Sequence, residues 1–373
     1  MAKKIKILFT GGGTGGHIMP LISVIREVKR LHGGDELKLS YIGPRDKESF
    51  ELLSKENVKT YTIASGKIRR YFSLMNVVDI FFGIPLGFFQ SLILILFISP
   101  KIVFSKGGSG ATVVTKAAHF WGTPIFIHES DAVPGLSNRS IAKSAKKIFT
   151  SFPTTEFFDA KKVTIVGNPI RKEILTGDKN QAKEMLSLSL ERPVILVIGG
   201  SQGAEAINEF ILLMLNELLK KYEVIHVAGP KNYTRVEIQS KFILQGEGSK
   251  YYHLYRFLNE VELKNAYQVA DVIISRAGAS SIFEIAALGK PAILIPLPTA
   301  AGNHQSKNAY QYAKSGGGVV MEQENLSPNL FLGEIDLLLS RAEAFKERAL
   351  QFSKPNAAED IAKALIEYVQ AKK

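Results

Sequence analysis

The chain has 373 residues, 46% of apolar types and 22% charged, which is the composition of a globular protein of about two domains. It contains no cysteine, and this excludes disulfides, a thiolate nucleophile, a cysteine zinc site and an iron–sulfur cluster. The net charge of +12 favours phosphorylated ligands, nucleic acid or an anionic membrane surface as partners.

The N-terminus is basic, but its first apolar run, residues 5–9, ends at a glycine cluster after a few residues. A secretory signal needs an apolar stretch of about 7–15 residues. We therefore expect a first β-strand here and a cytoplasmic chain.

Short apolar runs that end in glycine-containing loops recur along the chain, and each loop is followed by a helix-like stretch. Parallel strands covered on both faces have such continuous apolar runs, so the pattern predicts an α/β fold. The four strand, loop and helix sets are 5–9, 11–16 and 18–31; 102–104, 107–110 and 111–121; 194–198, 199–203 and 204–222; and 272–274, 276–281 and 282–288.

Two of these glycine loops precede residue 165 and two follow residue 190. The segment 166–171, Val-Gly-Asn-Pro-Ile-Arg, has turn chemistry and marks the boundary between them. We expect two Rossmann-like domains, 1–168 and 169–355, with parallel sheets facing a central cleft. Residues 356–373 should form a C-terminal helix that can pack back on the N-terminal domain.

Residues 77–98 are strongly apolar but are interrupted by polar residues, glycines and a proline. Three interpretations are open: a buried helix followed by a buried parallel strand, a surface patch that enters the lipid headgroup region, or a membrane span of about 20 residues. The preceding Lys67, Arg69 and Arg70 favour the interfacial interpretation, because cations beside exposed apolar side chains suit anionic lipid.

The first glycine loop, 11–16, fits the pattern G-x-G-x-x-G, in which glycines let the backbone approach an anionic ligand. His17 follows it directly and is placed to accept a proton from an alcohol. Alternatively, the loop is a structural βα turn and His17 packs at a helix start. A nicotinamide site would need an acid after the second strand, where Asp46 comes too late.

The second half offers three further candidates, each with a structural alternative. Ser201 lies in the loop 199–203 and can hold a diphosphate or simply cap a helix. Glu284 lies near the start of a helix, where a carboxylate can bind ribose hydroxyls or complement the helix dipole. The polar segment 303–308 can bind sugar hydroxyls or form an ordinary loop.

Several motifs are absent from the sequence. It has no D-x-D pair, no H-E-x-x-H and no G-x-x-x-x-G-K-[ST] loop, so no metal site is expected. The charge of a diphosphate would then be met by helix N-termini and Arg171. Aromatic and basic residues do not interleave, which argues against nucleic acid.

Five motifs, in the same order and across nearly the whole chain, resemble those of the MurG family of bacterial glycosyltransferases. They are residues 12–17, 128–131 with 135–139, 167–171, 199–203 and 275–308. The family has the GT-B fold and inverts the anomeric centre. It transfers N-acetylglucosamine (GlcNAc) from UDP-GlcNAc to the C4 hydroxyl of the muramoyl unit of lipid I, forming lipid II for peptidoglycan synthesis.

The resemblance also implies where the protein works and with what. It implies a peripheral enzyme on the cytoplasmic face of the cell membrane, in contact with an anionic membrane surface and with lipid I. It implies no tightly bound cofactor, with a divalent cation as a stimulant at most. The alternatives are another GT-B glycosyltransferase with a lipid or natural-product acceptor, and a non-catalytic UDP-sugar-binding membrane protein.

Carried over by motif, the resemblance assigns roles to individual residues. His17 is the candidate catalytic base, with Glu129 as a rival or helper. The acceptor would meet Thr14, Gly15 and Gly16, and the donor diphosphate would meet Arg171 and Ser201. Ala279, Ser280 and Ser281 would line the nucleotide pocket, with Leu258 packing at the uracil. Glu284 would bind the ribose, and His304 with Gln305 would bind GlcNAc.

Asp131 departs from the family pattern, which has asparagine at this position. A carboxylate here could repel a diphosphate or could act as a base. The resemblance therefore leaves the role of Asp131 at the substrate site open.

Overall fold

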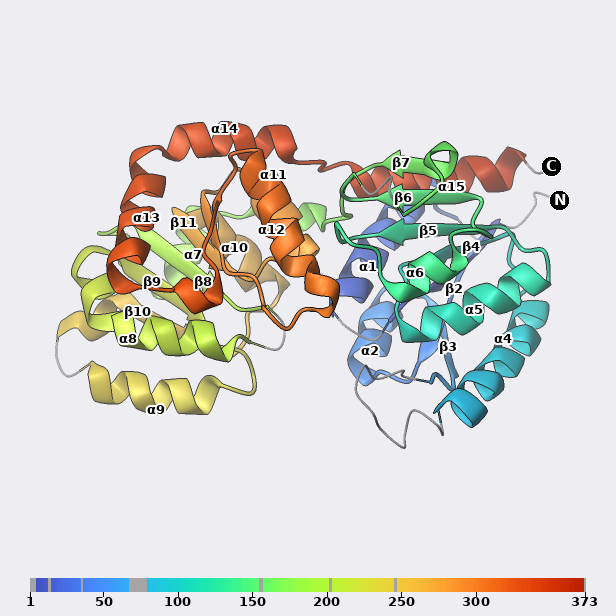
Figure 1. The fold of residues 1–373 in the computed structure, drawn as a ribbon, viewed down its shortest axis with the longest axis horizontal. Helices are drawn as coiled ribbons and strands as arrows, with labels where there is room; N and C mark the ends of the chain where they lie inside the picture. The colour runs from blue at the N-terminus through green and yellow to red at the C-terminus, as the bar shows by residue number, and fades with distance from the viewer. Residues whose placement is uncertain are drawn as a thin grey trace. The chain divides into compact units, whose positions relative to one another are not determined.

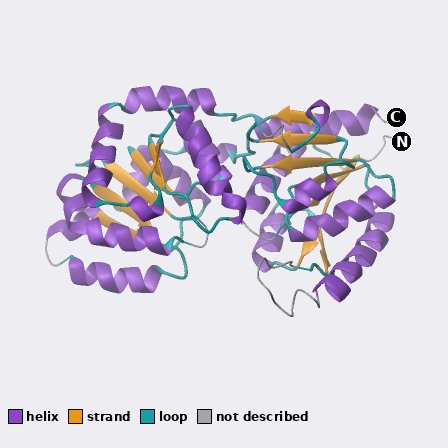
Figure 2. Cartoon of the chain, viewed as in Figure 1, coloured by secondary structure: helices purple, strands orange, loops and turns teal. Residues whose placement is uncertain are grey.

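The computed structural model describes residues 5–12, 15–34, 36–66, 79–153, 157–200, 203–244 and 247–371. The chain divides into two compact units, Met1–Ile170 with Pro355–Lys373, and Arg171–Lys354. Each unit is a parallel sheet with helices on both faces (Figures 1 and 2). The predicted α/β class and parallel strands are therefore confirmed.

In the described part of the first unit, seven strands lie in the order β3-β2-β1-β4-β5-β6-β7, and every pair is parallel. Its elements are β1 (Ile5–Thr10), α1 (Gly15–Leu31), β2 (Leu37–Pro44), α2 (Lys47–Lys55), β3 (Lys59–Ile63), α4 (Ile84–Ile98), β4 (Ile102–Ser105), α5 (Ser109–Phe120), β5 (Ile125–Glu129), α6 (Leu136–Ile141), β6 (Lys147–Thr150), β7 (Val163–Ile165) and α15 (Ala357–Ala371).

In the described part of the second unit, six parallel strands lie in the order β10-β9-β8-β11-β12-β13. Its elements are α7 (Lys179–Met185), β8 (Val194–Ile198), α8 (Glu205–Lys221), β9 (Glu223–Val227), α9 (Tyr233–Ile243), β10 (Tyr252–Tyr255), α10 (Glu260–Val269), β11 (Val272–Ser275), α11 (Ala279–Leu288), β12 (Ala292–Leu294), α12 (His304–Lys314), β13 (Val319–Val320), α13 (Pro328–Ser340) and α14 (Ala342–Phe352).

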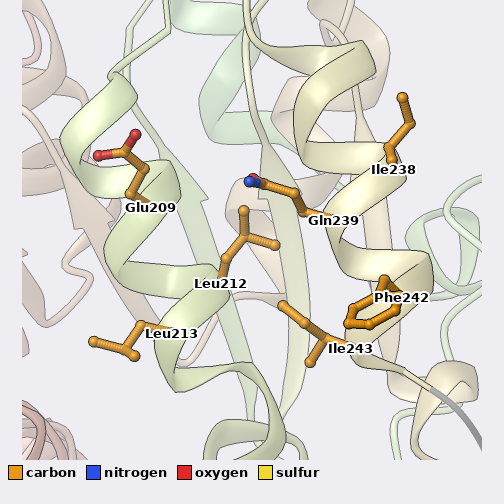
Figure 3. A pocket seen from close by; sticks show the side chains of 7 residues that line it. All are labelled: Glu209, Leu212, Leu213, Ile238, Gln239, Phe242 and Ile243. Atoms are coloured by element: carbon orange, nitrogen blue, oxygen red, sulfur yellow. The ribbon is translucent and has the colours of Figure 1, made fainter.

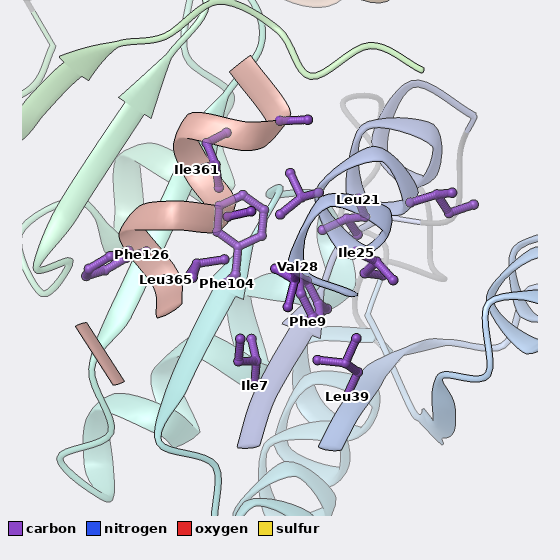
Figure 4. Packing of buried hydrophobic residues seen from close by; sticks show 14 of the residues in the cluster. Ile7, Phe9, Leu21, Ile25, Val28, Leu39, Phe104, Phe126, Ile361 and Leu365 are labelled. Carbon is purple, nitrogen blue, oxygen red and sulfur yellow. The ribbon is translucent and has the colours of Figure 1, made fainter. Parts of the chain in front are cut away.

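The C-terminal helix α15 completes the core of the first unit rather than that of the second. Figure 4 shows Ile361 and Leu365 of α15 in one cluster with α1 side chains such as Leu21 and Ile25 and with the strand residue Phe104. These side chains are all buried. Helix α15 has a strong apolar stripe, and this stripe packs against the apolar surface of the first unit. The last fifteen described residues are thus part of the first unit's fold.

The apolar segment around residues 79–98 does not form a buried helix followed by a strand. A short π-helical turn, Asp79–Gly83, leads directly into α4, so the interpretation as a buried helix and strand is wrong. One narrow side of α4, made by Gly87, Ser91 and Ile95, is buried where the helix packs beside α5 (Figure 1). Gln90 accepts a hydrogen bond from the Ala64 N–H at 2.7 Å.

The π-helical turn and the remaining surface of α4 carry large exposed apolar side chains. In the turn, Phe82 is 71% exposed and Phe81 is more than half exposed. On α4, Phe97 is 81% exposed, and Leu86, Phe89, Ile93 and Leu96 are all more than half exposed. By length and composition alone, Phe81–Ile98 would also be long enough to cross a membrane. Contiguous exposed apolar surface of this kind marks a site of interaction with lipid or protein. The basic residues Lys67, Arg69 and Arg70 lie outside the described residues.

Candidate functional site

Each sheet has one point where the strand order reverses, and there the loops diverge at the carboxyl ends of two neighbouring strands. In the first unit the reversal lies between β1 and β4, and in the second between β8 and β11. In open parallel sheets, ligands bind in the crevice at this point. All four glycine-containing loops found in the sequence follow these four strands, so each unit has one candidate site.

The two glycine loops of the first unit pack backbone against backbone. Gly108 has φ +94°, and a Cβ built on it would lie 2.6 Å from the Gly12 nitrogen, so no larger residue fits without movement. Gly107 has φ +79° and lies against the Asn138 side chain. Tyr41 donates a hydrogen bond of 3.0 Å from its buried hydroxyl to the Gly11 carbonyl, which holds the first loop in place from the next strand.

His17 is the third residue of α1 and is half-buried at the mouth of the first glycine loop. Its Nδ1 lies 3.3 Å from the point that a Cβ on Gly12 would occupy, so the imidazole is beside the loop backbone. Gly15 and Gly16 form the first two residues of the same helix, whose free N–H groups face the carboxyl edge of the sheet. Thr14 lies outside the described residues.

Glu129 ends β5 and is buried, whereas Asp131, two residues later, is half-exposed. The Glu129 carboxylate accepts hydrogen bonds from the backbone N–H groups of Asp131 and Gly135, both at 3.0 Å, and from Asn138 Nδ2 at 2.9 Å. Burial and the neighbouring Asp131 raise the pKa of Glu129 above its ordinary value. The carboxylate therefore orders the loop 130–138, and its oxygens point into the protein.

In the second unit, Arg171 and Glu284 form a buried ion pair although they are 113 residues apart. Arg171 Nη2 donates to one oxygen of Glu284 at 3.1 Å, and the Tyr267 hydroxyl donates to the other at 3.1 Å. Burial lowers the pKa of Arg171, but the charge and the hydrogen bond of Glu284 act against it, and the pKa of Arg171 is raised above its ordinary value. Arg171 Nε is buried and has no hydrogen-bond partner in the described structure, so one donor remains for a ligand.

The helices that follow β8 and β11 begin without a capping side chain. Gly278 precedes α11 and contributes no side-chain hydrogen bond, and the helix begins with Ala279, Ser280 and Ser281, so its N-terminus is of the kind that suits an anion. Ala279 is buried, while the two serines are half-exposed. Before α8, Gly200 and Gly203 have φ +87° and +77°, but Ser201 lies outside the described residues.

Leu258, His304 and Gln305 follow the carboxyl ends of β10 and β12, on the same edge of the second sheet. Leu258 is buried between β10 and α10. His304 starts α12, and its Nδ1 lies 2.8 Å from the Ala301 carbonyl oxygen. Gln305 Oε1 accepts a hydrogen bond from the Leu297 N–H at 3.0 Å, so this side chain fixes the loop that leads to α12.

Three polar side chains that belong to these sites were not identified from the sequence: Tyr267, Arg276 and Lys106. Tyr267 supports Glu284, and Arg276 donates to the carbonyls of Ile295 and Pro296 at 3.2 and 3.1 Å, at the end of β12. Lys106 is buried directly after β4. A basic residue that interrupts a strand–glycine junction, as Lys106 and Arg276 do, is the signal that would have found two of them.

A separate hollow lies on the outer side of the second unit, between α8 and α9. Figure 3 shows Leu212 and Leu213 of α8 across from Ile238, Phe242 and Ile243 of α9, with Glu209 and Gln239 as its polar side chains. It contains no glycine loop or helix N-terminus that would suit a phosphate. Within the described residues, no group of three His, Cys, Asp or Glu side chains could hold a metal ion.

Comparison with known proteins decides the family. The model of the glycosyltransferase family 28 N-terminal domain matches residues 7–150, and that of its C-terminal domain matches residues 194–365. A UDP-N-acetylglucosamine–N-acetylmuramyl-(pentapeptide) pyrophosphoryl-undecaprenol N-acetylglucosamine transferase of Clostridium tetani is 36% identical over 99% of both chains. The chain belongs to the MurG family.

Further relatives agree with this assignment. A transferase of the same name from Clostridium perfringens is 37% identical over 92% of both chains. The crystal structure of Acinetobacter baumannii MurG superposes with a TM-score of 0.74 at 23% identity, covering 97% of this chain and 99% of that one. The two Rossmann-like units are thus the two halves of a GT-B fold, and this MurG-family chain is a glycosyltransferase.

Proposed function

We propose that this protein transfers GlcNAc from UDP-GlcNAc to the C4 hydroxyl of the muramoyl unit of lipid I, forming lipid II for peptidoglycan synthesis. The observation that carries the proposal is the full-length identity of 36% to a transferase whose name states this donor and acceptor. The reaction needs a diphosphate-bearing donor and a diphosphate-bearing acceptor, and each unit has a glycine-lined switch point suited to an anion.

In the proposed chemistry, the acceptor's C4 oxygen attacks the anomeric carbon of GlcNAc as the bond from that carbon to the UDP oxygen breaks. The hydroxyl proton passes to His17, whose half-buried imidazole beside the first glycine loop supports the role of general base. Attack from the side opposite the leaving group inverts the anomeric centre. Glu129 is proposed as a helper that orders the loop 130–138, because three N–H donors hold its carboxylate.

The leaving UDP is proposed to lie at the switch point of the second unit. Its negative charge would be met by the N-terminus of α11, where Ala279, Ser280 and Ser281 lie, and by Arg171. Together they would supply fixed positive potential where charge develops. Glu284 would bind the ribose, since each of its oxygens has a lone pair left after the bonds to Arg171 and Tyr267.

The other proposed contacts to the donor are inferred from where the residues lie along the carboxyl edge of the second sheet. Leu258 would pack at the uracil, Ser201 would contact the diphosphate, and His304 with Gln305 would meet GlcNAc. Thr14, Gly15 and Gly16 would contact the acceptor from the first unit. No tightly bound cofactor is proposed, and stimulation by a divalent cation stays a prediction to be tested by adding and chelating Mg²⁺.

We further propose that the protein is peripheral on the cytoplasmic face of the membrane, with α4 against the lipid. The exposed apolar side chains of α4 and the net charge of +12 support this placement on an anionic surface. The helix packs on α5 along its Gly87–Ser91–Ile95 side, which suits a helix lying in the interface. A lipid-linked acceptor would then be reached without leaving the bilayer.

Transfer of labelled GlcNAc to a lipid I analogue tests the proposal, with wild type beside His17→Ala and His32→Ala. His32 lies just after the other end of α1 and serves as the matched control. We expect transfer by wild type and His32→Ala, and a loss of about a hundredfold or more in His17→Ala. Equal transfer by His17→Ala would move the base to Glu129 or Asp131, and UDP-GlcNAc binding without any transfer would favour a non-catalytic sugar-nucleotide binder.

A further inference from the structure

A buried arginine joins the carboxyl ends of three adjacent strands in the second unit. Arg276 follows β11 directly and is 8% exposed. Its Nη1 donates to the carbonyls of Ile295 and Pro296, at the end of the neighbouring strand β12, at 3.2 and 3.1 Å. Its Nη2 donates at 2.7 Å to Gln323 Oε1, just after β13. One side chain therefore links the ends of β11, β12 and β13, which are neighbours in the sheet.

The guanidinium of Arg276 makes these bonds without a counter-charge. All three acceptors are uncharged oxygens, and burial lowers the pKa of Arg276 with no carboxylate of the described residues acting against it. Arg171, in contrast, is paired with Glu284 at 3.1 Å. Burying a cation without an ion pair is destabilising, and departures of this kind are expected at functional sites. The placement of Arg276 therefore points to a role at this edge of the sheet.

Both loops that Arg276 connects belong to the proposed donor site. The nucleotide loop, residues 276–278, leads into α11, whose N-terminus is proposed to meet the UDP diphosphate. The sugar loop, residues 296–303, leads into α12, where Gln305 is proposed to meet GlcNAc. The Leu297 N–H of the sugar loop donates to Gln305 Oε1 at 3.0 Å. The start of the sugar loop is thus bonded to Arg276 on one side and to a proposed GlcNAc contact on the other.

The backbone ladder between β11 and β12 does not hold the sugar loop in place. The ladder ends where the Ile295 N–H donates to the Ser275 carbonyl at 2.8 Å, because Pro296 has no N–H to extend it. The carbonyls of Ile295 and Pro296 are held by the guanidinium instead. The nucleotide loop has a separate support, since Asn308 Nδ2 donates to the Ala277 carbonyl at 3.3 Å. Loss of the guanidinium should therefore release the sugar loop more than the nucleotide loop.

We propose that Arg276 is a positioning residue that fixes the sugar loop relative to the nucleotide loop, so that the GlcNAc and UDP parts of the donor are recognised together. This inference rests on the proposed function, because it takes the two loops to bind the two parts of UDP-GlcNAc. Arg276 acts through the loops: it sets where His304 and Gln305 lie relative to the start of α11.

Calorimetric titration of UDP and of UDP-GlcNAc, each into wild type and into Arg276→Met, tests this role. Methionine keeps an unbranched side chain but has no hydrogen-bond donor. We expect Arg276→Met to weaken UDP-GlcNAc binding about tenfold or more, while UDP binding stays within about threefold. Equal weakening for the two ligands, or no weakening of either, would overturn the proposal.

Lys290→Met is the matched control for a general loss of stability. Lys290 also makes two bonds from a cation to carbonyls, those of Gln268 and Ala270, both at 2.8 Å. These bonds lie at the amino edge of the same sheet, before β11 and β12. Lys290→Met should lower the melting temperature but leave the ratio of the UDP and UDP-GlcNAc dissociation constants unchanged. A change of that ratio as large as in Arg276→Met would contradict the proposal.

Gln323→Ala covers the case in which Arg276→Met does not fold, because it removes only the bond to Nη2 of a half-buried partner. It should change the ratio of dissociation constants in the same direction, by about twofold or more, and an unchanged ratio would count against the role of Arg276. Wild-type protein separates the two claims. Absence of transfer by wild type would refute the proposed function, whereas wild-type transfer with an unchanged ratio in the variants refutes only the role of Arg276.

Discussion

Three exposed aromatic side chains lie on α4 and on the π-helical turn that precedes it, and replacing them should release the protein from membranes. Phe82, Phe89 and Phe97 are 71%, 62% and 81% exposed, which together correspond to about two whole phenylalanine side chains. Full burial of one such side chain is worth about 1.5–3 kcal/mol, so their transfer into lipid is worth about 3–6 kcal/mol. Replacing all three by serine should therefore weaken vesicle binding by about a hundredfold or more.

Co-sedimentation with vesicles containing anionic lipid measures this partitioning. Phe242→Ser is the matched control, because Phe242 is 78% exposed but lies on α9 of the second unit. The triple variant should keep its melting temperature, since exposed substitutions seldom change stability by more than about 0.5 kcal/mol. Vesicle binding equal to wild type, or an equal loss in Phe242→Ser, would refute the assignment of α4 to the lipid surface.

Three further predictions concern the described contacts. Glu284→Ala leaves Arg171 buried without its partner and should lower the free energy of unfolding by about 3–5 kcal/mol in a urea titration; a loss below about 1 kcal/mol would show that the pair is not needed. Burial lowers the pKa of His226 to about 3, so the unfolded chain binds a proton below about pH 6.5 that the folded chain does not. Stability should fall by about 2 kcal/mol between about pH 6.5 and pH 5, and His226→Gln should remove that share; an identical pH dependence in both proteins would argue against a neutral buried imidazole. Gly108→Ala places a Cβ against Gly12 at φ +94° and should cost about 1–3 kcal/mol with a loss of transfer, whereas unchanged melting and activity would mean that the two loops are not tightly packed.

The sequence predicted the fold class because four of its strands, β1, β4, β8 and β11, are each followed by a glycine-containing loop and then by a helix. The strand expected at 194–198 agrees with β8, and the helix expected within residues 356–373 is α15 (Ala357–Ala371). The nature of α4 could not be predicted, because hydropathy is the same for a helix buried in protein and for one facing lipid. Only the packing of its narrow Gly87 side separates the two.

Contacts between residues that are distant in sequence could not be predicted either. Arg171 and Glu284 each stood out by motif, but nothing in the spacing of 113 residues shows that they form an ion pair. Tyr267 belongs to the helix before β11 and reaches Glu284 only because parallel strands bring the two helices together. Lys106 looked like one basic residue among many until its burial among three acceptors was seen.

The most direct test of the central claim is the product formed by wild-type protein from labelled UDP-GlcNAc. With a lipid I analogue, one UDP should be released for each GlcNAc transferred, and the new linkage should have the anomeric configuration opposite to that of the donor. An analogue without the diphosphate should be a much poorer acceptor. Retention of configuration, or equal transfer to an alcohol that lacks the muramoyl diphosphate, would contradict the account.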